Sequence, residues 1–437
     1  MKRKVIAALG TATALVLTGC SSGSGSGSAK SGSGGTVTVH MVESLTNPTR
    51  TALLKTLIGQ FEKANPTIKV DLISPPTDTA DQKIQQMLQA GSGVDVLEVR
   101  DTTVGPFSTN GWLHDMGPDL AGWDGWSAMT DNAVKASKYV KGKTYFVPYG
   151  FYGLSLFYRT DLISQAGFSG PPASWDDLLK QASALQNTGK HQYGYAFRGG
   201  TNGSANAVQA IESYIADRVD PADAFKTTDG KTIFAAPEAQ TALDTYFKLF
   251  KQASPPSSIS WGYPEMVQGF SNGSTGFLLQ DPEVIETVGQ SKAITKEQWS
   301  TAPLPVGPTG KTVQPLATAG WGVAAKSSHP AEAEKLIEFL STGEASTTFD
   351  KQNSLVPILK AAADDEFYKT GAWASYVTMT SQPDKYLVVS QPRDVAWWTE
   401  WQHKADADVQ KVLLGQMTTQ QLLSGWDAYW TGKAAGK

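Results

Sequence analysis

Polar side chains that can bind a hydroxylated molecule follow three predicted strands of this chain. Glu43 and Ser44 come after the first of these strands, Arg100 and Asp101 after the second, and Asp281 after the third. Loops at strand ends carry many binding residues, and one carboxylate can accept hydrogen bonds from two hydroxyl groups. We therefore predict ligand contacts here. The alternatives are solvated loop charges for the first two pairs and an Asp-Pro turn without a ligand role for Asp281.

Tryptophan is the second unusual feature, with 13 residues in the chain. Trp397 and Trp398 stand before a predicted helix, and Trp401 follows one turn later. An indole has a large apolar face and an N–H that needs a partner, so three such rings in one place are not all expected in a core. We predict that Trp397 and Trp398 stack on a ligand and that Trp401 packs. Trp261 and Trp321 are further candidates for ligand contact.

Motifs for catalysis are missing from the sequence outside its Gly/Ser-rich segment. The five histidines have no metal-ligand spacing, and there is no P-loop, GxSxG or GxGxxG motif. We therefore predict no catalytic residue, no metal and no cofactor. The alternative is a lipid-anchored glycoside hydrolase, which needs only two carboxylates and an aromatic cleft, or another carbohydrate-active surface protein. Asp281 or Glu283 facing Asp101 or Glu43 would meet that need.

The N-terminus predicts export and a lipid anchor. Residues 2–4 are basic, and the apolar stretch 5–16 is shorter than the roughly 20 residues that span a bilayer. The run LTGC, which ends at Cys20, the sole cysteine, resembles the lipobox of bacterial lipoproteins. We predict a signal peptide at 1–19, then a lipidated cysteine and a flexible Gly/Ser tether at 20–35. The alternative is a secreted protein with an unmodified cysteine.

Size and charge limit the remaining possibilities. The roughly 400 residues after the tether are enough for two lobes with cores of their own. The net charge is −4 without a long basic run, so we predict no nucleic-acid partner. With its cysteine used for lipid, the body has no disulfide. We expect a monomer, because no large apolar helix face is evident.

Strand and helix patterns alternate in the first part of the body. Period-2 apolar patterns predict strands at 36–42 and 68–73, and a third strand is predicted at 94–99. Helical spacing predicts helices from Pro48 and over 81–90. This βαβαβ order predicts a parallel sheet with helices on both faces.

A second set of elements follows the point where the chain is predicted to cross between the lobes. Tyr149, Phe151 and Tyr152 lie at this crossing. We predict ligand contacts for Tyr149 and Tyr152 and hinge packing for Phe151. The later predicted elements are strands at 154–158, 275–279 and 320–324, and helices that begin after Ser174, at Pro237 and at Pro330, with a helical C-terminus.

Four segments of the chain resemble a known family. GKTYFVPYGFYGLSLFYRTDLISQAGF is followed by PPASWDDLLKQASAL, and further on come FSNGSTGFLLQDPE and APLPVGPTGKTVQPLATAGWGVAAKSSHP. In this order and spacing they resemble the extracellular solute-binding proteins of ABC importers, in the branch that includes maltose-binding protein. The chain departs from the family pattern at Asp281, Pro282 and Glu283, where a Trp is frequent, and at Arg159, where an Asn is frequent.

The resemblance implies an α/β, two-lobed, type II periplasmic-binding-protein-like fold, with a mixed, mainly parallel sheet in each lobe and a hinge of crossing strands. Lobe 1 is expected at 36–147 and 312–352, and lobe 2 at 148–311 and 353–437. The ligand would lie between the lobes.

The implied function is that of a substrate-binding lipoprotein outside the cytoplasm, which delivers a carbohydrate to a membrane permease. Tyr and Trp with few cleft cations favour a neutral, hydroxyl-rich ligand of one or several sugar units. By position, Trp397 and Trp398 resemble the aromatic stacking pair of the maltose-binding branch.

Overall fold

The computed structural model describes residues 35–46, 48–138, 140–190, 192–393, 395 and 397–436. The predicted signal peptide, Cys20 and all but the last residue of the predicted tether lie outside the described residues. None of the helices in the described part of the chain is long and apolar enough to cross a membrane.

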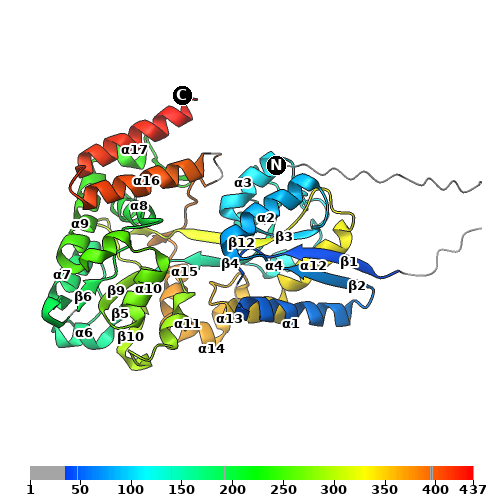
Figure 1. Cartoon of the computed structure of the whole chain (residues 1–437), viewed down its shortest axis with the longest axis horizontal. Helices are drawn as coiled ribbons and strands as arrows, with labels where there is room; N and C mark the ends of the chain where they lie inside the picture. The colour runs from blue at the N-terminus through cyan, green and yellow to red at the C-terminus, as the bar shows by residue number, and fades with distance from the viewer. Residues whose placement is uncertain are drawn as a thin grey trace, which may run out of the picture. The chain divides into compact units, whose positions relative to one another are not determined.

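Five strands form the first sheet, in the order β2-β1-β3-β12-β4 (Figure 1). β1 runs parallel to β2 and β3, which confirms the predicted parallel unit, and β12 is antiparallel to both β3 and β4. The strands are β1 (Val37–Val42), β2 (Ile68–Ile73), β3 (Val96–Arg100), β4 (Val147–Gly153) and β12 (Leu316–Val323). We call this sheet and its helices lobe 1.

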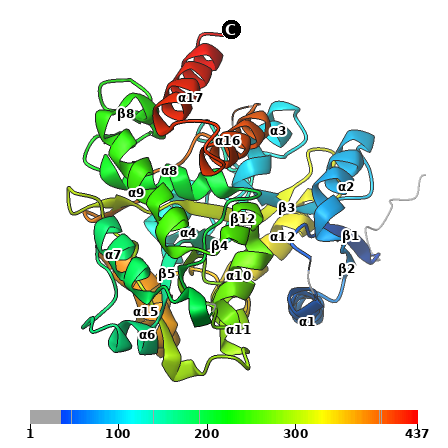
Figure 2. The same cartoon turned by 60° about the vertical axis from the view of Figure 1, so that its left-hand side comes forward.

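Helices cover both faces of the first sheet, as predicted. β1 and β2 lie between α1 and α2 (Figure 2). Leu54 and Phe61 of α1 are buried with Val39 of β1, whereas Ile84 and Leu88 of α2 belong to a separate apolar cluster. The helices of lobe 1 are α1 (Pro48–Ala64), α2 (Thr77–Ala90), α3 (Asp101–Thr109), α4 (Gly125–Ala128), α5 (Asp131–Ser137), α12 (Pro330–Leu340) and α13 (Gly343–Gln352).

Four strands form the second sheet, in the order β10-β5-β9-β6. β9 is antiparallel to β5 and parallel to β6, so this sheet is also mixed. Its strands are β5 (Ser155–Arg159), β6 (Tyr193–Tyr195), β9 (Thr275–Gln280) and β10 (Trp299–Ala302). Two short pairs, β7 (Val219–Asp220) with β8 (Asp223–Thr227) and β11 (Thr312–Val313) with β13 (Tyr386–Leu387), stand outside both sheets.

The helices around the second sheet include the C-terminal pair, α16 and α17, which pack on α8 and α9 (Figure 1). α7 begins as the sequence predicts, because Oγ of Ser174 accepts a hydrogen bond from the amide of Asp177 at 3.1 Å. The α-helices of lobe 2 are α6 (Thr160–Gln165), α7 (Trp175–Leu185), α8 (Gly203–Tyr214), α9 (Pro237–Ala253), α10 (Tyr263–Ser271), α11 (Val284–Gly289), α14 (Glu366–Lys369), α15 (Ala374–Ser381), α16 (Trp398–Leu413) and α17 (Thr419–Ala434). Short 3₁₀ turns connect several of them.

The chain passes between the sheets at Leu154. Gly153 is the last residue of β4 paired with β12, and Ser155 is already paired with Gln280 in the second sheet. A further contact at this crossing joins Phe151 to Val356 through two backbone hydrogen bonds of 3.0 Å. The predicted lobe boundary between residues 147 and 148 falls at the start of β4, so β4 carries Tyr149 to Tyr152 up to the crossing.

Candidate functional site

Lobe 1 contributes a buried ion pair at the carboxyl ends of its strands. Nη2 of Arg50 lies 2.6 Å from Oε1 of Glu98, and both side chains are at most 2% exposed. The other oxygen of Glu98 accepts hydrogen bonds from the amides of Ser44 and Leu45 at 2.5 and 2.9 Å. Burial alone would raise the pKa of Glu98, but Arg50 and these hydrogen bonds outweigh it and hold the pKa below its usual value. Glu98 is therefore charged, and both of its carboxylate oxygens have partners.

Glu43 and Ser44 face this buried centre. Oε1 of Glu43 accepts hydrogen bonds from the hydroxyls of Thr51 and Ser74 at 2.7 and 2.6 Å. The hydroxyl of Ser44 donates to Glu98 at 3.0 Å. Both predicted residues are buried, and their hydrogen bonds fix the loop after β1. Their roles as ligand contacts stay predictions.

Tyr149 and Trp321 pack against each other at the hinge. Their ring centroids lie 5.2 Å apart, and Phe349 lies 5.1 Å from Tyr149. The hydroxyl of Tyr149 donates to Glu98, while the guanidinium of Arg50 lies 5.0 Å from the centre of the Tyr149 ring. Tyr149 is 0% exposed and Trp321, a β12 residue rather than a loop residue, is 1% exposed. A ligand would touch either ring only after this packing opens, so both assignments stay predictions.

Tyr152 lies between the charged groups of the two lobes. Its hydroxyl is 3.2 Å from that of Tyr149, and the residue is half-buried. Burial raises the pKa of Tyr152, and the negative charges of Glu283 from lobe 2 and Glu98 from lobe 1 add to this effect, against the charge of Arg50. The Tyr152 side chain thus interacts electrostatically with charged groups of both lobes.

Two carboxylates of lobe 2 follow β9 directly. Asp281 accepts a hydrogen bond from the amide of Glu283 at 3.2 Å. Burial and the neighbouring charge of Glu283 raise the pKa of Asp281 to about 8. Burial also raises the pKa of Glu283; the charge of Arg50 opposes this rise, and the charge of Glu98 adds to it. Within the described ranges neither carboxylate forms an ion pair, so both keep hydrogen-bonding capacity for a ligand.

Arg198 and Tyr263 interact electrostatically with Asp281 and were not predicted from the sequence. Burial lowers the pKa of Arg198, against the charges of Asp406 and Asp281. Burial and the charges of Asp281 and Glu283 raise the pKa of Tyr263. Asp406 itself is held by the amides of residues 202 and 204 at 2.6 and 3.0 Å. A cation and a phenol therefore join the two carboxylates on the lobe 2 side.

Asp101 forms an ion pair between the lobes. Its Oδ2 lies 2.8 Å from Nη1 of Arg393, whose guanidinium lies 5.9 Å from the centre of the Trp398 ring. Arg393 donates to Oε1 of Gln391 at 3.0 and 3.2 Å, and Gln391 donates to Glu212 at 2.9 Å. Burial raises the pKa of Glu212 to about 8. A polar chain thus runs from the core of lobe 2 to lobe 1.

A cavity of about 330 Å³ adjoins this ion pair. Asp101 and Lys135 line it from lobe 1, Phe151 from the hinge, and Val389 and Arg393 from lobe 2. Of the predicted site residues in the described part of the chain, Asp101 lines this cavity. A larger group lies around Glu98 of lobe 1 and Asp281 of lobe 2, and consists of Glu43, Ser44, Tyr149, Tyr152, Trp321 and Asp281. We take that larger group as the candidate site because it concentrates the hydrogen-bonding groups of both lobes.

Arg100 pairs with Asp81 of α2 rather than with lobe 2. Its side chain is 27% exposed, and burial opposes the rise in pKa that Asp81 causes. Trp261 is half-buried and lies against α10, where a Cβ on Gly269 would come within 2.8 Å of its ring. The structure thus places Arg100 at the lobe 1 rim and Trp261 at the start of α10.

The tryptophans at the start of α16 pack against Trp430 of α17 and Phe225 of β8. The ring of Trp397 lies 4.4 Å from that of Trp430, and Trp398 lies 5.8 Å from Phe225. Trp401 is 2% exposed and lies 5.4 Å from Trp430, which confirms its predicted packing. Trp398 is only 7% exposed, whereas Trp397 is half-buried. Of the predicted stacking pair, Trp397 is the more accessible ring.

Glu98, Arg50 and Arg198 are the main site residues that the sequence analysis missed. Glu98 lies in an apolar strand, VLEVR, and a charged residue inside such a run is itself a signal, since it needs a buried partner. Arg50 lies in the first turn of α1, six residues after Ser44, the nearest predicted site residue. Only the folded arrangement brings it to Glu98.

Comparisons with known proteins agree with this architecture. A family described as bacterial extracellular solute-binding protein matches residues 46–346. A putative binding protein of Brucella abortus (strain 2308) is 22% identical over 359 residues, which are 82% of this chain and 83% of that protein.

Solved structures show the same fold. The maltose-bound MalE3 protein of T. maritima superposes with a TM-score of 0.76 at 23% identity, over 90% of this chain and 99% of that one. An ABC substrate-binding protein of Listeria monocytogenes in complex with cycloalternan gives 0.75 at 20% identity, over 92% and 99%. The predicted two-lobed fold is confirmed. Because the family match spans most of the chain, the protein belongs to the bacterial extracellular solute-binding proteins.

Proposed function

We propose that the protein is the carbohydrate-binding component of an ABC importer and that it holds its sugar between the two lobes. Membership of the solute-binding family supports capture of a small solute. Proteins of the same fold were solved with maltose and with cycloalternan, which supports a sugar as the solute.

The observation that carries this proposal is the pair of lobe 2 carboxylates. Glu283 lies close enough to Tyr152 and to Arg50 of lobe 1 to interact electrostatically with both, and Asp281 interacts with Glu283 and with Arg198. A carboxyl group with a raised pKa keeps its proton at higher pH, and the protonated group offers both a donor and an acceptor, which suits sugar hydroxyls. A sugar that contacts both lobes binds their closed arrangement more tightly and shifts the population toward it.

Capture without turnover is part of the proposal. The hydrolase alternative needs a second carboxylate from lobe 1, and both predicted ones are engaged. Asp101 is paired with Arg393, and Glu43 accepts hydrogen bonds from Thr51 and Ser74. These contacts support binding rather than proton transfer.

The predicted anchor completes the proposal. A lipid on Cys20, which lies outside the described residues, and the Gly/Ser tether would hold a monomeric body near the permease on the outer side of the membrane. Cys20→Ala should release the protein from the membrane with its sugar affinity unchanged. Continued membrane association of that variant without detergent would contradict the anchor alone.

Thermal unfolding of the full-length protein against a panel of mono- and oligosaccharides and polyols tests the proposed function. A ligand that binds only the folded state stabilises it by about 2.7 kcal/mol at 100 times its Kd. We expect one sugar class to raise Tm and to be recovered unaltered by chromatography. New reducing ends after long incubation would favour the hydrolase, and no shift with any sugar or polyol would contradict the proposal.

A further inference from the structure

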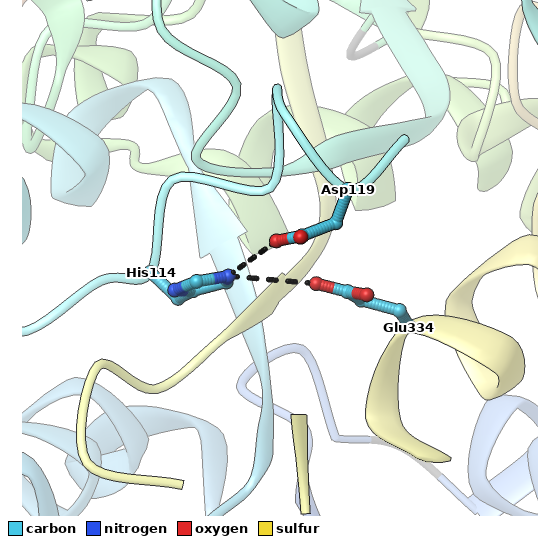
Figure 3. Close-up of side chains that lie close together, drawn as sticks. All are labelled: His114, Asp119 and Glu334. Carbon is cyan, nitrogen blue, oxygen red and sulfur yellow. Dashed lines mark hydrogen bonds and ion pairs between the residues drawn. The ribbon is translucent and has the colours of Figure 1, made fainter. Parts of the chain in front are cut away.

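His114, Asp119 and Glu334 form a separate cluster in lobe 1. Nε2 of His114 lies 2.8 Å from Oδ2 of Asp119 and 3.5 Å from Oε1 of Glu334 (Figure 3). One ligand atom from each residue lies within 4.8 Å of the other two. The side chains are 36%, 48% and 13% exposed, so the cluster opens to solvent on one side. The polar groups of the candidate sugar site are not part of it.

The backbone that carries these side chains is held in place. The amide of His114 donates to the carbonyl of Val323 at 2.9 Å, and Leu113 forms a β-bridge with Ala324. After Asp115 the loop is fixed again, because the amide of Met116 donates to Thr144 at 2.9 Å.

The backbone that carries Glu334 is also held in place. It lies in α12, where Ala333 and Leu336 are fully buried against the first sheet. The three side chains therefore converge from two fixed elements, a condition that favours a preorganised site.

The spacing suits a small divalent ion. Zinc bonds to nitrogen and oxygen are about 2.0–2.2 Å long, so two ligands at tetrahedral positions lie about 3.3–3.5 Å apart. The 3.5 Å between Nε2 of His114 and Oε1 of Glu334 already falls in this range. The distance between Nε2 of His114 and Oδ2 of Asp119 is 2.8 Å and would need to increase by only about half an ångström to reach it.

The electrostatics of the cluster also favour a cation. Oε1 of Glu334 is buried and makes no hydrogen bond within the described structure. The carboxylates of Asp119 and Glu334 both lie beside Nε2 of His114, which brings their two negative charges close together. A bound cation would replace repulsion between the two carboxylates by attraction to both.

We propose that His114, Asp119 and Glu334 bind one divalent transition-metal ion of the zinc class, with water completing the coordination. One imidazole and two carboxylates are ligands that Zn²⁺ accepts, whereas Mg²⁺ and Ca²⁺ prefer oxygen ligands alone. The ion would join the loop after α3 to α12 and so clamp the outer part of lobe 1.

Titration of the metal-free, full-length protein with Zn²⁺, followed with a chromophoric chelator as competitor, tests this site. We expect one ion at micromolar or tighter Kd that is lost in His114→Ala and at least tenfold weaker in Glu334→Gln. His403→Ala, which removes an exposed histidine of α16, is the matched control and should bind like the wild type.

Thermal unfolding without metal shows whether each variant is folded. If His114→Ala unfolds, Asp119→Asn replaces it in the titration, with the same expected loss. Zn²⁺ should raise Tm of the wild type and of His403→Ala, whereas Mg²⁺ at the same concentration should not. Wild-type affinity in folded His114→Ala or Asp119→Asn, or no Zn²⁺ binding by the wild type, would overturn the proposal. If the protein is found to bind no sugar but still binds Zn²⁺ as expected, the metal site is supported and the proposed function is not. The two proposals can therefore fail separately.

Discussion

The two sides of the candidate site differ in whether their acidic side chains have an ion-pair partner. In lobe 1, Glu98 is paired with Arg50 and accepts hydrogen bonds from the loop after β1. In lobe 2, Asp281 and Glu283 repel each other and lack an ion-pair partner among the described residues. A buried charge is tolerated when it is paired, whereas a buried charge without a partner is costly, so removal of one member of a pair is strongly destabilising. Lobe 1 therefore uses its charges to fix the hinge, whereas lobe 2 keeps its carboxyl groups available.

Removing Glu98 should have the largest effect on stability. Glu98→Ala leaves the charge of Arg50 buried without its main partner, and such changes cost about 3–5 kcal/mol. Urea unfolding measures this loss. Lys69→Ala, which breaks the surface pair with Glu62 at 3.0 Å, is the control and should cost at most about 1 kcal/mol. Equal, small losses in both variants would remove the structural role assigned to lobe 1.

The two adjacent tryptophans of lobe 2 should separate packing from binding. Trp398 is 7% exposed, so Trp398→Ala should lower the free energy of unfolding by about 3–5 kcal/mol. Trp397→Ala should cost less stability, because the ring is half-buried, and weaken sugar binding by about 1–3 kcal/mol if it stacks on the sugar. Denaturant unfolding and calorimetric titration of both variants give the two numbers. Unchanged affinity in Trp397→Ala would refute the stacking prediction.

The pH dependence of stability should reveal the cost of the lobe 2 carboxyls. The pKa of Asp281 is about 8 in the folded protein and has its ordinary value near 4 in the unfolded chain. The folded state thus holds an extra proton between about pH 4 and pH 8, and the stability that it contributes is lost as the pH rises through this window.

Asp281→Asn should remove this part of the pH dependence. The stability of the wild type relative to this variant should fall from about pH 5 to about pH 8, by at most about 1.4 kcal/mol per pH unit for one group. Urea midpoints at several pH values measure it. Parallel curves for the two proteins would show that Asp281 titrates normally.

Breaking the interlobe ion pair should have the smallest effect. Arg393 and Asp101 are 21% and 16% exposed, so solvent screens their attraction. Arg393→Ala should weaken sugar binding by at most about 1 kcal/mol through an easier opening of the lobes. Titration calorimetry gives the affinity, and small-angle scattering of the sugar-free protein should show a larger radius of gyration. A radius equal to that of the wild type would contradict this role.

Periodic patterns predicted most of the fold. β2 has the predicted bounds, and β1, β3 and β9 differ from prediction by only one or two residues at an end. β3 and β9 are almost wholly buried, and in β1 and β2 apolar and polar residues alternate, so the sequence patterns of these strands are strong. The antiparallel places of β4 and β12 were harder to foresee, because they depend on how the chain crosses between the sheets.

The candidate site was less predictable than the fold. Positions after strands pointed to Asp281, which lies in the candidate site, and to Asp101, which lies at the separate interlobe cavity. The pairing of Arg50 with Glu98 depends on how α1 docks on the sheet, which no local pattern encodes. For the same reason burial separated Trp398 from Trp397, although the two are neighbours in the sequence.

Calorimetric titration of Asp281→Ala with the sugar that stabilises the wild type tests the central claim most directly. Glu286→Ala, which removes an exposed carboxylate of α11, is the matched control. We predict that Asp281→Ala binds the sugar at least tenfold more weakly, about 1.4 kcal/mol, without a lower Tm, and that the control binds like the wild type. Wild-type affinity in a folded Asp281→Ala variant would contradict the assignment of the lobe 2 carboxyls to the sugar.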